Sequence, residues 1–594
     1  MNEIHASPQL QSNVHEHKNP EKIEITETTS SIDMTETTNS DEGDRRQKLA
    51  FRAGDIPKWK QSLLLGFQQT MICISGILIA PYLVSEIACA GVDTIALRVQ
   101  LISTTFVVTG ITTLFQTVFG LRLAILQGPS FAFLPPLYAF ANLPEMRCNA
   151  TINDFVPPES YLDRVRTIQG SLALAALLLI FVGATGLIGF ISRHIGPITI
   201  CPLLLLLCLG NTNVILEKGS LHWISIVQFC CLLMFTVYLA EHNVPLPYYS
   251  ERKIRFAKYR LFGQFPYLLS ILIAYAVAFT LSKANWISAD SPARVDKEQS
   301  ILNLRESPWF HVPYPGQFGI PKLSVGLFLG MLASCVACSI ESLGAYGILA
   351  KVSEEKPPSA STLNRAIVIE GFGCCLAGLM GIGVGITTYS ENVAAVSITR
   401  VASRHTMQIA GIILIFLGVF TKVGAVLATI PDPIVGGILG MGVCMITGVA
   451  LSNLEYVNIK LSRNLTIMGI SIIMGVVIPD YFESHPVDTG VRDIDQMLNI
   501  LLTIRMFVGG MIAFILDNTC SGATRDERGF QPNIILPVDK DIDNENDPDG
   551  YAFPQKVNEF LIKYSGFCKF PFMPSMKRLE ATSMPSLNDP NSPH

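Results

Sequence analysis

Long apolar stretches recur along most of this 594-residue chain and are separated by short polar segments. Stretches of roughly 18 or more apolar residues are typical of transmembrane helices. The pattern therefore predicts an all-α polytopic membrane protein whose surroundings are the lipid bilayer. The fourteen expected spans are 62–84, 99–119, 121–141, 169–192, 195–210, 221–240, 263–282, 323–350, 364–383, 386–400, 406–428, 433–452, 464–482 and 498–517.

Two of these segments are too short, or too broken by glycine and proline, to be ordinary spanning helices. They are the third, LRLAILQGPSFAFLPPLYAFA (121–141), and the tenth, ITTYSENVAAVSITR (386–400). Irregular backbone at membrane depth is tolerated only where protein covers it or where it lines a cavity. Because the two broken segments are seven spans apart, we expect two inverted seven-span repeats with a binding site between them. A boundary error would instead leave twelve or thirteen spans.

The polar regions suggest where the repeats begin and end. Residues 1–52 are rich in Glu, Thr, Ser, Asn and Asp, and this composition predicts a disordered cytoplasmic tail. We expect the two repeats at 53–282 and 323–521, with an extracellular loop at 283–322 between them. A second cytoplasmic tail is expected at 522–594.

The composition excludes several classes of protein. Hydrophobic residues make up 49% of the chain and charged residues 15%, which is too little charge to cover a soluble protein of this size. The net charge of −5 gives no indication of nucleic-acid binding. Most of the fourteen cysteines lie in apolar segments without zinc or redox spacing, so we expect no metal site. No nucleophile–base pair or phosphate-binding loop indicates an enzyme.

Two independent signals predict the orientation in the membrane. The segment 251–260 holds five basic residues and should be cytoplasmic by the positive-inside rule. Asn149 begins a glycosylation sequon in the loop after the third span, which this topology places outside. Both termini are then cytoplasmic, and the plasma membrane is the expected location. Cys89 and Cys148 both fall in extracellular loops, where either a disulfide or free thiols would be compatible with the sequence. A second sequon at Asn464 falls on the cytoplasmic side and should stay unmodified.

Apart from charges within two residues of a span end, five charged side chains lie inside the predicted spans, where charge is costly and usually functional. They are Glu341, Glu370, Glu391, Lys422 and Arg505. We interpret Glu370 and Lys422 as members of an internal ion pair or of packing hydrogen bonds, and we assign Arg505 no role.

Glu341 and Glu391 are the predicted substrate ligands. Glu341 lies in the small-residue segment ACSIESLGAYG, which suits a helix that lines a cavity. Glu391 lies at the break of the tenth span, and a helix beginning there would point its N–H groups into the cavity. The neighbouring Asn392 offers both a donor and an acceptor.

A series of ordered motifs over residues 50–530 resembles the nucleobase–ascorbate transporter family (solute carrier family 23), especially its animal sodium-dependent vitamin C transporter branch. The motifs are DIPKW (55–59), LLGFQQ (64–69), LQGPSFAFLPP (126–136), PYPGQFGIP (313–321), ESLGAY (341–346), Asn364-Arg365 with Glu370-Gly371, TTYSENVAAVSITRVASR (387–404), IPDPIVGG (430–437), LSNLEYVNIKLSRNL (451–465) and MFVGGMIAFILDNTCSG (506–522).

The resemblance implies a fourteen-span transporter with a core domain (spans 1–4 and 8–11) and a dimer-forming gate domain (spans 5–7 and 12–14). The core would move against the gate in an elevator-type mechanism, coupled to Na+ or H+ and with no other cofactor. The substrate residues it implies are Glu341, Gln69, Ser130 and Phe131, together with the signature motif that includes Glu391, Asn392, Ala394, Thr399 and Arg400.

Three positions depart from the family pattern. Gln69 stands where the family usually has His, and Ala394 stands where it has Gly. Ala345 replaces the Asp that follows the eighth-span Glu in the animal branch and helps to hold sodium. Because the Ala345 side chain offers no ligand oxygen, the sequence leaves the coupling ion open.

The chemistry of the expected site favours a nucleobase over ascorbate. Ascorbate is an anion, and two ionised carboxylates would repel it. A planar nucleobase can donate N–H groups to Glu341 and Glu391, accept from Asn392 and stack on Phe131. The whole-chain resemblance favours the alternative, a sodium-dependent L-ascorbate symporter. A further alternative is a transport-impaired protein that binds the solute as a sensor or partner subunit.

Overall fold

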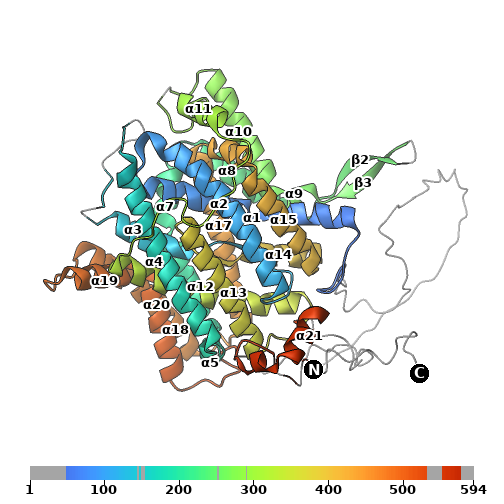
Figure 1. Ribbon diagram of the computed structural model, residues 1–594, viewed down its shortest axis with the longest axis vertical. Helices are drawn as coiled ribbons and strands as arrows, with labels where there is room; N and C mark the ends of the chain where they lie inside the picture. The colour runs from blue at the N-terminus through green and yellow to red at the C-terminus, as the bar shows by residue number, and fades with distance from the viewer. Residues whose placement is uncertain are drawn as a thin grey trace, which may run out of the picture. The chain divides into compact units, whose positions relative to one another are not determined.

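The structure, a computed structural model, describes residues 49–143, 146–148, 154–250, 253–288, 290–530, 551–574, 576 and 579 (Figure 1). The sequon residue Asn149 and almost all of the predicted tail 1–52 lie outside these ranges. Within them, nine helices are long and apolar enough to cross a membrane, or up to eleven if each of two bent pairs is one span. The chain is therefore a multi-pass membrane protein.

The spanning helices agree in position with the apolar stretches of the sequence. The nine are α1 (Trp59–Ile87), α2 (Thr94–Val118), α4 (Pro158–Ala184), α6 (Pro197–Gly210) continued by α7 (Thr212–Gly219), α10 (Pro266–Lys283), α12 (Val325–Val352), α13 (Ala360–Met380), α17 (Asp432–Ser452) and α18 (Ser462–Ser484). The bent pairs are α15 (Arg404–Val419) with α16 (Thr421–Ala428), and α19 (Arg492–Thr503) with α20 (Arg505–Thr519).

The three remaining predicted segments contain shorter helices. They hold η2 (Phe131–Phe133) with α3 (Leu134–Ala141), α8 (Ile224–Leu233) with the π-helical η3 (Met234–Tyr238), and α14 (Ser390–Thr399). The connecting elements are η1 (Gly91–Asp93), α5 (Leu187–Ile191), α9 (Leu261–Gln264), α11 (Glu298–Glu306) and η4 (Asn453–Tyr456), followed by α21 (Gln555–Lys563) and η6 (Ser565–Lys569).

The two broken segments meet in the interior. β1 (Gln127–Pro129) pairs with β4 (Ile386–Thr388) in an antiparallel ladder in which Gly128 is opposite Thr387. Each strand is followed at once by a helix, so both segments run as strand and then helix. The ladder supplies hydrogen-bond partners to extended backbone that lipid could not satisfy.

Close helix crossings surround this ladder. α2 packs along α15, and α4 packs along α13. At the first crossing, a Cβ on Gly110 would lie 2.5 Å from the carbonyl oxygen of Gly411, so the two backbones approach too closely for a side chain. We call α2, α4, α13 and α15 the first packing group. In the second packing group, α6 packs against α18 and α20, and α17 packs against α7 and α8.

A hairpin that the sequence analysis did not predict includes residues 253–259 of the basic segment. β2 (Val244–Ser250) pairs antiparallel with β3 (Lys253–Tyr259) and extends away from the helices (Figure 1). The positive charge of this segment is therefore carried by a projecting β-ribbon.

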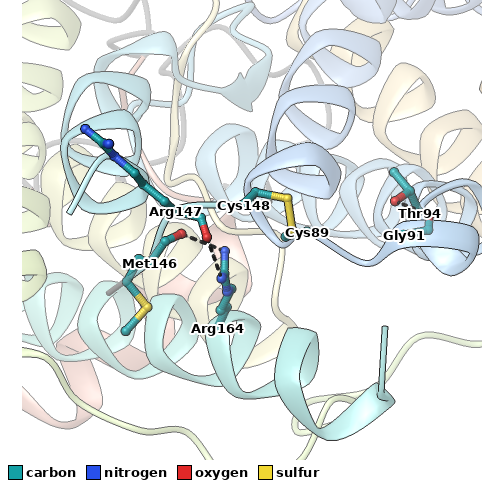
Figure 2. The surroundings of a disulfide bond; sticks show 7 residues. All are labelled: Cys89, Gly91, Thr94, Met146, Arg147, Cys148 and Arg164. Atoms are coloured by element: carbon teal, nitrogen blue, oxygen red, sulfur yellow. Dashed lines mark hydrogen bonds between the residues drawn. A yellow bond between two sulfur atoms is a disulfide. The ribbon is translucent and has the colours of Figure 1, made fainter. Parts of the chain in front are cut away.

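A disulfide joins Cys89, directly after α1, to Cys148 in the loop after α3 (Figure 2). Arg164 of α4 holds the same loop, because its guanidinium donates to the carbonyl oxygens of Met146 (2.8 Å) and Arg147 (3.5 Å). The loop is thus tied to two transmembrane helices.

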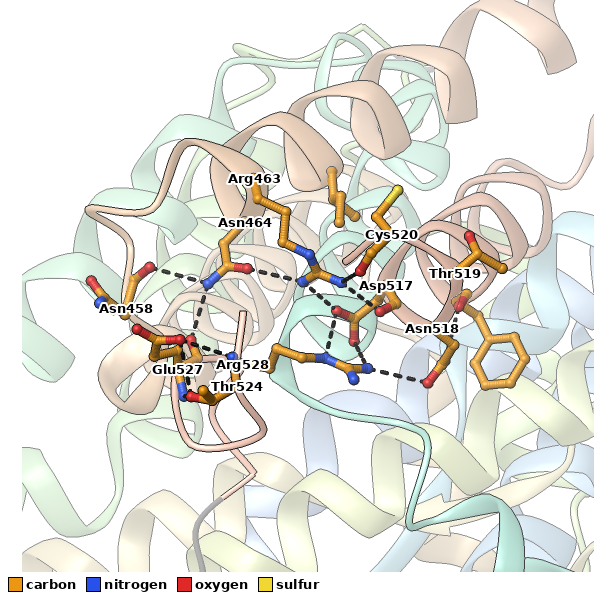
Figure 3. Close-up of polar contacts among 12 residues, drawn as sticks. Asn458, Arg463, Asn464, Asp517, Asn518, Thr519, Cys520, Thr524, Glu527 and Arg528 are labelled. Atoms are coloured by element: carbon orange, nitrogen blue, oxygen red, sulfur yellow. Dashed lines mark hydrogen bonds and ion pairs between the residues drawn. The ribbon is translucent and has the colours of Figure 1, made fainter. Parts of the chain in front are cut away.

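A polar network joins the N-terminal end of α18 to the C-terminal end of α20 (Figure 3). The buried carboxylate of Asp517 pairs with Arg463 (2.9 Å) and Arg528 (2.8 Å). The side chain of Asn464, the second sequon residue, is buried and donates to the carbonyl oxygens of Asn458 and Glu527. Hydrogen bonds from the backbone and hydroxyl of Thr524 lower the pKa of Glu527. The network fixes the chain that leaves α20.

Candidate functional site

A pocket lies where the β1–β4 ladder ends. It is lined by Pro129, Ser130, Phe131, Leu207, Glu341, Thr387, Thr388, Tyr389, Ser390, Glu391 and Ile446. Four of the predicted substrate residues, Ser130, Phe131, Glu341 and Glu391, line this pocket together.

The β1–β4 ladder places the N-termini of two helices, η2 and α14, at the pocket. Phe131 is the first residue of η2, and Glu391 is the second residue of α14. Ser130 is held by three contacts: its N–H donates to Gly385 O (2.9 Å), its Oγ accepts from Ala132 N (3.2 Å), and its Oγ also accepts from the thiol of Cys338 on α12 (3.0 Å). The pocket wall is thus bonded across three elements distant in sequence.

Two carboxylates share the pocket. Glu341 reaches it from α12 and Glu391 from α14, and each residue is only 8% exposed. Among the described residues that line the pocket, none is basic. Two ionised carboxylates at such burial would repel each other, so the arrangement favours a proton, a cation or N–H donors from a solute between them.

Asn392 and Gln69 are not among the residues that line the pocket, and they bond each other. The Asn392 amide nitrogen donates to Gln69 Oε1 (2.7 Å) and to the Gln69 carbonyl oxygen (3.0 Å). These bonds fasten α14 to α1. The buried Oδ1 of Asn392 has no hydrogen-bond partner among the described residues. Some of the predicted substrate residues therefore line the pocket, whereas Asn392 and Gln69 hold two helices together.

Glu370 does not line the pocket either, and it is hydrogen-bonded. It accepts from the Tyr346 hydroxyl (2.9 Å) and from the hydroxyl of Thr387 (3.3 Å), which lines the pocket. Gln116 of α2 in turn donates to the Tyr346 oxygen (2.9 Å). Glu370 thus makes the packing hydrogen bonds expected of it, and they reach the pocket wall.

The other two predicted charges lie outside the pocket. Lys422 donates to the carbonyl oxygens of Leu304 (2.6 Å) and Arg305 (3.1 Å) rather than pairing with Glu370. Arg505 pairs with Asp480 of α18 (2.8 Å). Neither contributes to the lining.

The residues of the signature motif lie at both ends of α14. Glu391 is at the pocket end, whereas Arg400 ends the helix in a left-handed conformation with φ of 57°. The Arg400 carbonyl accepts from Ala50 N (2.9 Å), and Thr399 Oγ1 donates to Ala395 O (2.9 Å). Arg400 therefore anchors the chain before α1, whereas the Thr399 hydroxyl bonds within its own helix. Neither residue lines the pocket, and the partly exposed Ala394 does not line it either. Ala345 is buried one turn beyond Glu341.

Sequence reasoning missed much of the lining. Thr387, Thr388 and Tyr389 lie within the quoted TTYSEN motif, which was a usable signal. Leu207 of α6 and Ile446 of α17 carried no such signal, because they are ordinary apolar residues of helices from the second packing group.

A buried ionic cluster also escaped the sequence analysis. Lys218 of α7 pairs with Glu86 of α1 (2.7 Å). Arg98 of α2 lies between Glu86 (3.5 Å) and Asp432 of α17 (3.8 Å), with its guanidinium 3.5 Å from the centre of the Tyr82 ring. The cluster connects α1 and α2 to α7 and α17, and therefore joins the two packing groups.

Comparison with known proteins identifies the family. The family model Xan_ur_permease, described as a permease family, matches residues 60–484. Human solute carrier family 23 member 2 is 37% identical over 546 residues, which cover 89% of this chain and 83% of that protein. The chain belongs to solute carrier family 23.

More distant relatives agree with this assignment. Rat solute carrier family 23 member 1 is 36% identical, covering 81% of this chain and 82% of the relative. Nucleobase-ascorbate transporter 7 of Arabidopsis thaliana is 29% identical, covering 87% of this chain and 95% of that protein. The transmembrane domain of a cyanobacterium bicarbonate transporter, BicA, aligns in structure with a TM-score of 0.40 at 13% identity, over 79% of this chain and 100% of that domain. The family match alone makes this chain a membrane solute transporter.

Proposed function

We propose that this transporter carries a nucleobase by alternating access, with Glu341 and Glu391 as the groups that bind the solute. The observation that supports this most directly is the lining of the pocket. Two carboxylates and the ring of Phe131 line it, together with three hydroxyl-bearing residues from 387–390 beside Tyr389. A neutral, planar solute with N–H donors satisfies such a lining without the repulsion that an anion would meet.

The position of the pocket supports an elevator-type movement. Most of the lining comes from β1, η2, α12, β4 and α14, whereas Leu207 and Ile446 come from α6 and α17. A displacement of these five elements against α6 and α17 would carry the bound solute past a fixed wall. The antiparallel β1–β4 pair and its two helix starts support the inverted fourteen-span arrangement. The gate helices would also form a homodimer.

The disulfide supports the proposed orientation. Disulfides persist in oxidising compartments, so the Cys89–Cys148 loop is assigned to the outside of the plasma membrane. The neighbouring sequon Asn149 would then be glycosylated, and both termini would be cytoplasmic.

Ascorbate is the second candidate, because the name of the Arabidopsis relative includes both solutes. An ascorbate anion would require a bound cation or proton to offset Glu341 and Glu391. Sodium and the proton are the proposed coupling ions, although Ala345 supplies no side-chain oxygen to a sodium site.

The test is uptake of labelled uracil, xanthine and ascorbate into transfected cells, with and without sodium. Uptake of uracil or xanthine that Glu391→Gln abolishes would support the proposal. Uptake of ascorbate alone would replace it with the second candidate. Intact surface expression without uptake of any solute would leave the solute-binding alternative.

A further inference from the structure

The segment before α12, predicted as part of an extracellular loop, is bonded to the break between α15 and α16. These two helices meet at a bend of 79°. His311 N donates to Val419 O (3.1 Å), and Thr421 N donates to Trp309 O (3.1 Å). Backbone groups at a helix break need partners wherever lipid replaces water. The segment around Trp309 supplies them here.

A ladder of apolar side chains continues from α15 onto this segment. Ile412, Phe416 and Phe420 are spaced four residues apart and therefore share one face of the chain. The Phe420 ring is 6.5 Å from that of Phe416, 5.8 Å from that of Trp309 and 5.5 Å from that of Phe310. The outward face of a transmembrane helix thus runs without interruption into the segment.

The aromatic side chains at the end of the ladder are open to the surroundings. Trp309 is 63% exposed and Phe310 66%, about the same as the outward-facing Phe416 at 64%. Val312 and Tyr314 extend the exposed apolar surface along the segment. Exposed apolar patches of this kind mark a surface that another phase or partner covers.

A cation lies beside this apolar surface. The Lys422 ammonium lies 5.6 Å from the centre of the Trp309 ring and bonds the last carbonyl groups of α11. α11 itself carries exposed charges, including Glu298 and Glu306. Aromatic rings beside a lysine, with lipid-facing residues on one side and charged residues on the other, are typical of the membrane–water boundary.

We propose that residues 309–314 form an interfacial strap: Trp309, Phe310 and Val312 insert into the boundary between headgroups and acyl chains of the outer leaflet. The occupant of this surface is the lipid bilayer, because the surface is continuous with the lipid-facing side of α15. The strap therefore anchors the α15–α16 break at a fixed depth. The side of the membrane rests on the proposed orientation, but the insertion itself does not depend on transport.

The experiment measures the depth of Trp309 by fluorescence. The full-length protein carries Trp59→Phe, Trp223→Phe and Trp286→Phe, so that Trp309 alone remains. It is reconstituted in phosphatidylcholine brominated either near the glycerol end or near the methyl end of the acyl chains. We expect stronger quenching by the bromines near the glycerol end, and weak quenching by aqueous iodide.

A matched control places the probe on α11. In the same background, Trp309→Phe with Glu298→Trp moves the single tryptophan to a charged, exposed position. This variant should respond to iodide and not to either brominated lipid. The proposal is overturned if Trp309 behaves like the control, which would make the strap a solvent-exposed loop. It is also overturned if neither quencher reaches Trp309, which would mean that protein, such as a second copy of the chain, covers it. Since no solute is used, a failure of the proposed function would not affect this result.

Discussion

The Tyr389 ring occupies the space that a side chain on Gly76 would need. A Cβ built on Gly76 of α1 would lie 1.5 Å from the Tyr389 hydroxyl oxygen. Gly128 of β1 lies on the ring as well, because its Cβ would be 2.3 Å from the ring carbon Cδ2. The Tyr389 ring, which lines the pocket, is therefore held between α1 and β1, the strand within the third predicted span.

Gly76→Ala should displace Tyr389 and impair the pocket. Overpacking of this kind costs about 1–3 kcal/mol, so both thermal stability and uptake should fall. Gly347→Ala is the control, since nothing lies within 4 Å of its added Cβ on α12. Unfolding temperature and solute uptake measure the two effects. Equal behaviour of the two variants would contradict the packing argument.

Glu341→Gln and Glu391→Gln should each weaken solute binding. Each change replaces a charged acceptor with a neutral one, which lowers the worth of the hydrogen bond from about 1.5–3 kcal/mol to about 0.5–1.5 kcal/mol and corresponds to a roughly 10-fold increase in KM. Concentration-dependent uptake measures this. Glu241→Gln, at an exposed position, should leave KM unchanged. An unchanged KM in both pocket variants would remove the carboxylates from the solute site.

Ala345→Asp should increase sodium dependence. The new carboxylate would lie one helical turn beyond Glu341 and would add oxygen ligands of the kind that hard cations prefer. Uptake measured over a series of sodium concentrations checks this, and Ala345→Asn provides a control of similar size without the charge. A sodium response that stays the same in all three proteins would argue against a cation site at this turn.

The ionic cluster gives a test of coupling between the two packing groups. Lys218→Glu and Glu86→Lys should each be destabilising by less than the roughly 3–5 kcal/mol that breaking a fully buried pair costs, because the Glu86 side chain is partly exposed. The double variant restores opposite charges and should recover part of the loss. Thermal unfolding of the four proteins forms a double-mutant cycle. Strictly additive losses would show that the 2.7 Å contact contributes no coupling.

Several features could be predicted from the sequence because they follow from local order. The apolar stretches predicted the spanning helices, since a helix must satisfy its own backbone in lipid. Glycine and proline in 121–141 and the short length of 386–400 indicated the two breaks, and the structure places Glu341 and Glu391 in one pocket beside them.

Other features depended on contacts between distant segments. Nothing in the local pattern around Leu207 or Ile446 distinguishes a pocket wall from an ordinary packed helix, and only the approach of α6 and α17 decided it. The motif residues Thr399 and Arg400 lie at the wrong end of α14 to line the pocket, because a ten-residue helix separates them from Glu391 by about 12 Å.

What the sequence by itself determined is the membrane class, the family and the pair of acids that line the pocket. What only the tertiary structure decided is which side chains surround those acids and which ones hold them in place. The physical reason is that hydrophobic periodicity acts within a helix, whereas a pocket is formed where separate helices and strands meet. The Tyr389 ring between Gly76 and Gly128 is such a case, since it joins residues more than 250 positions apart.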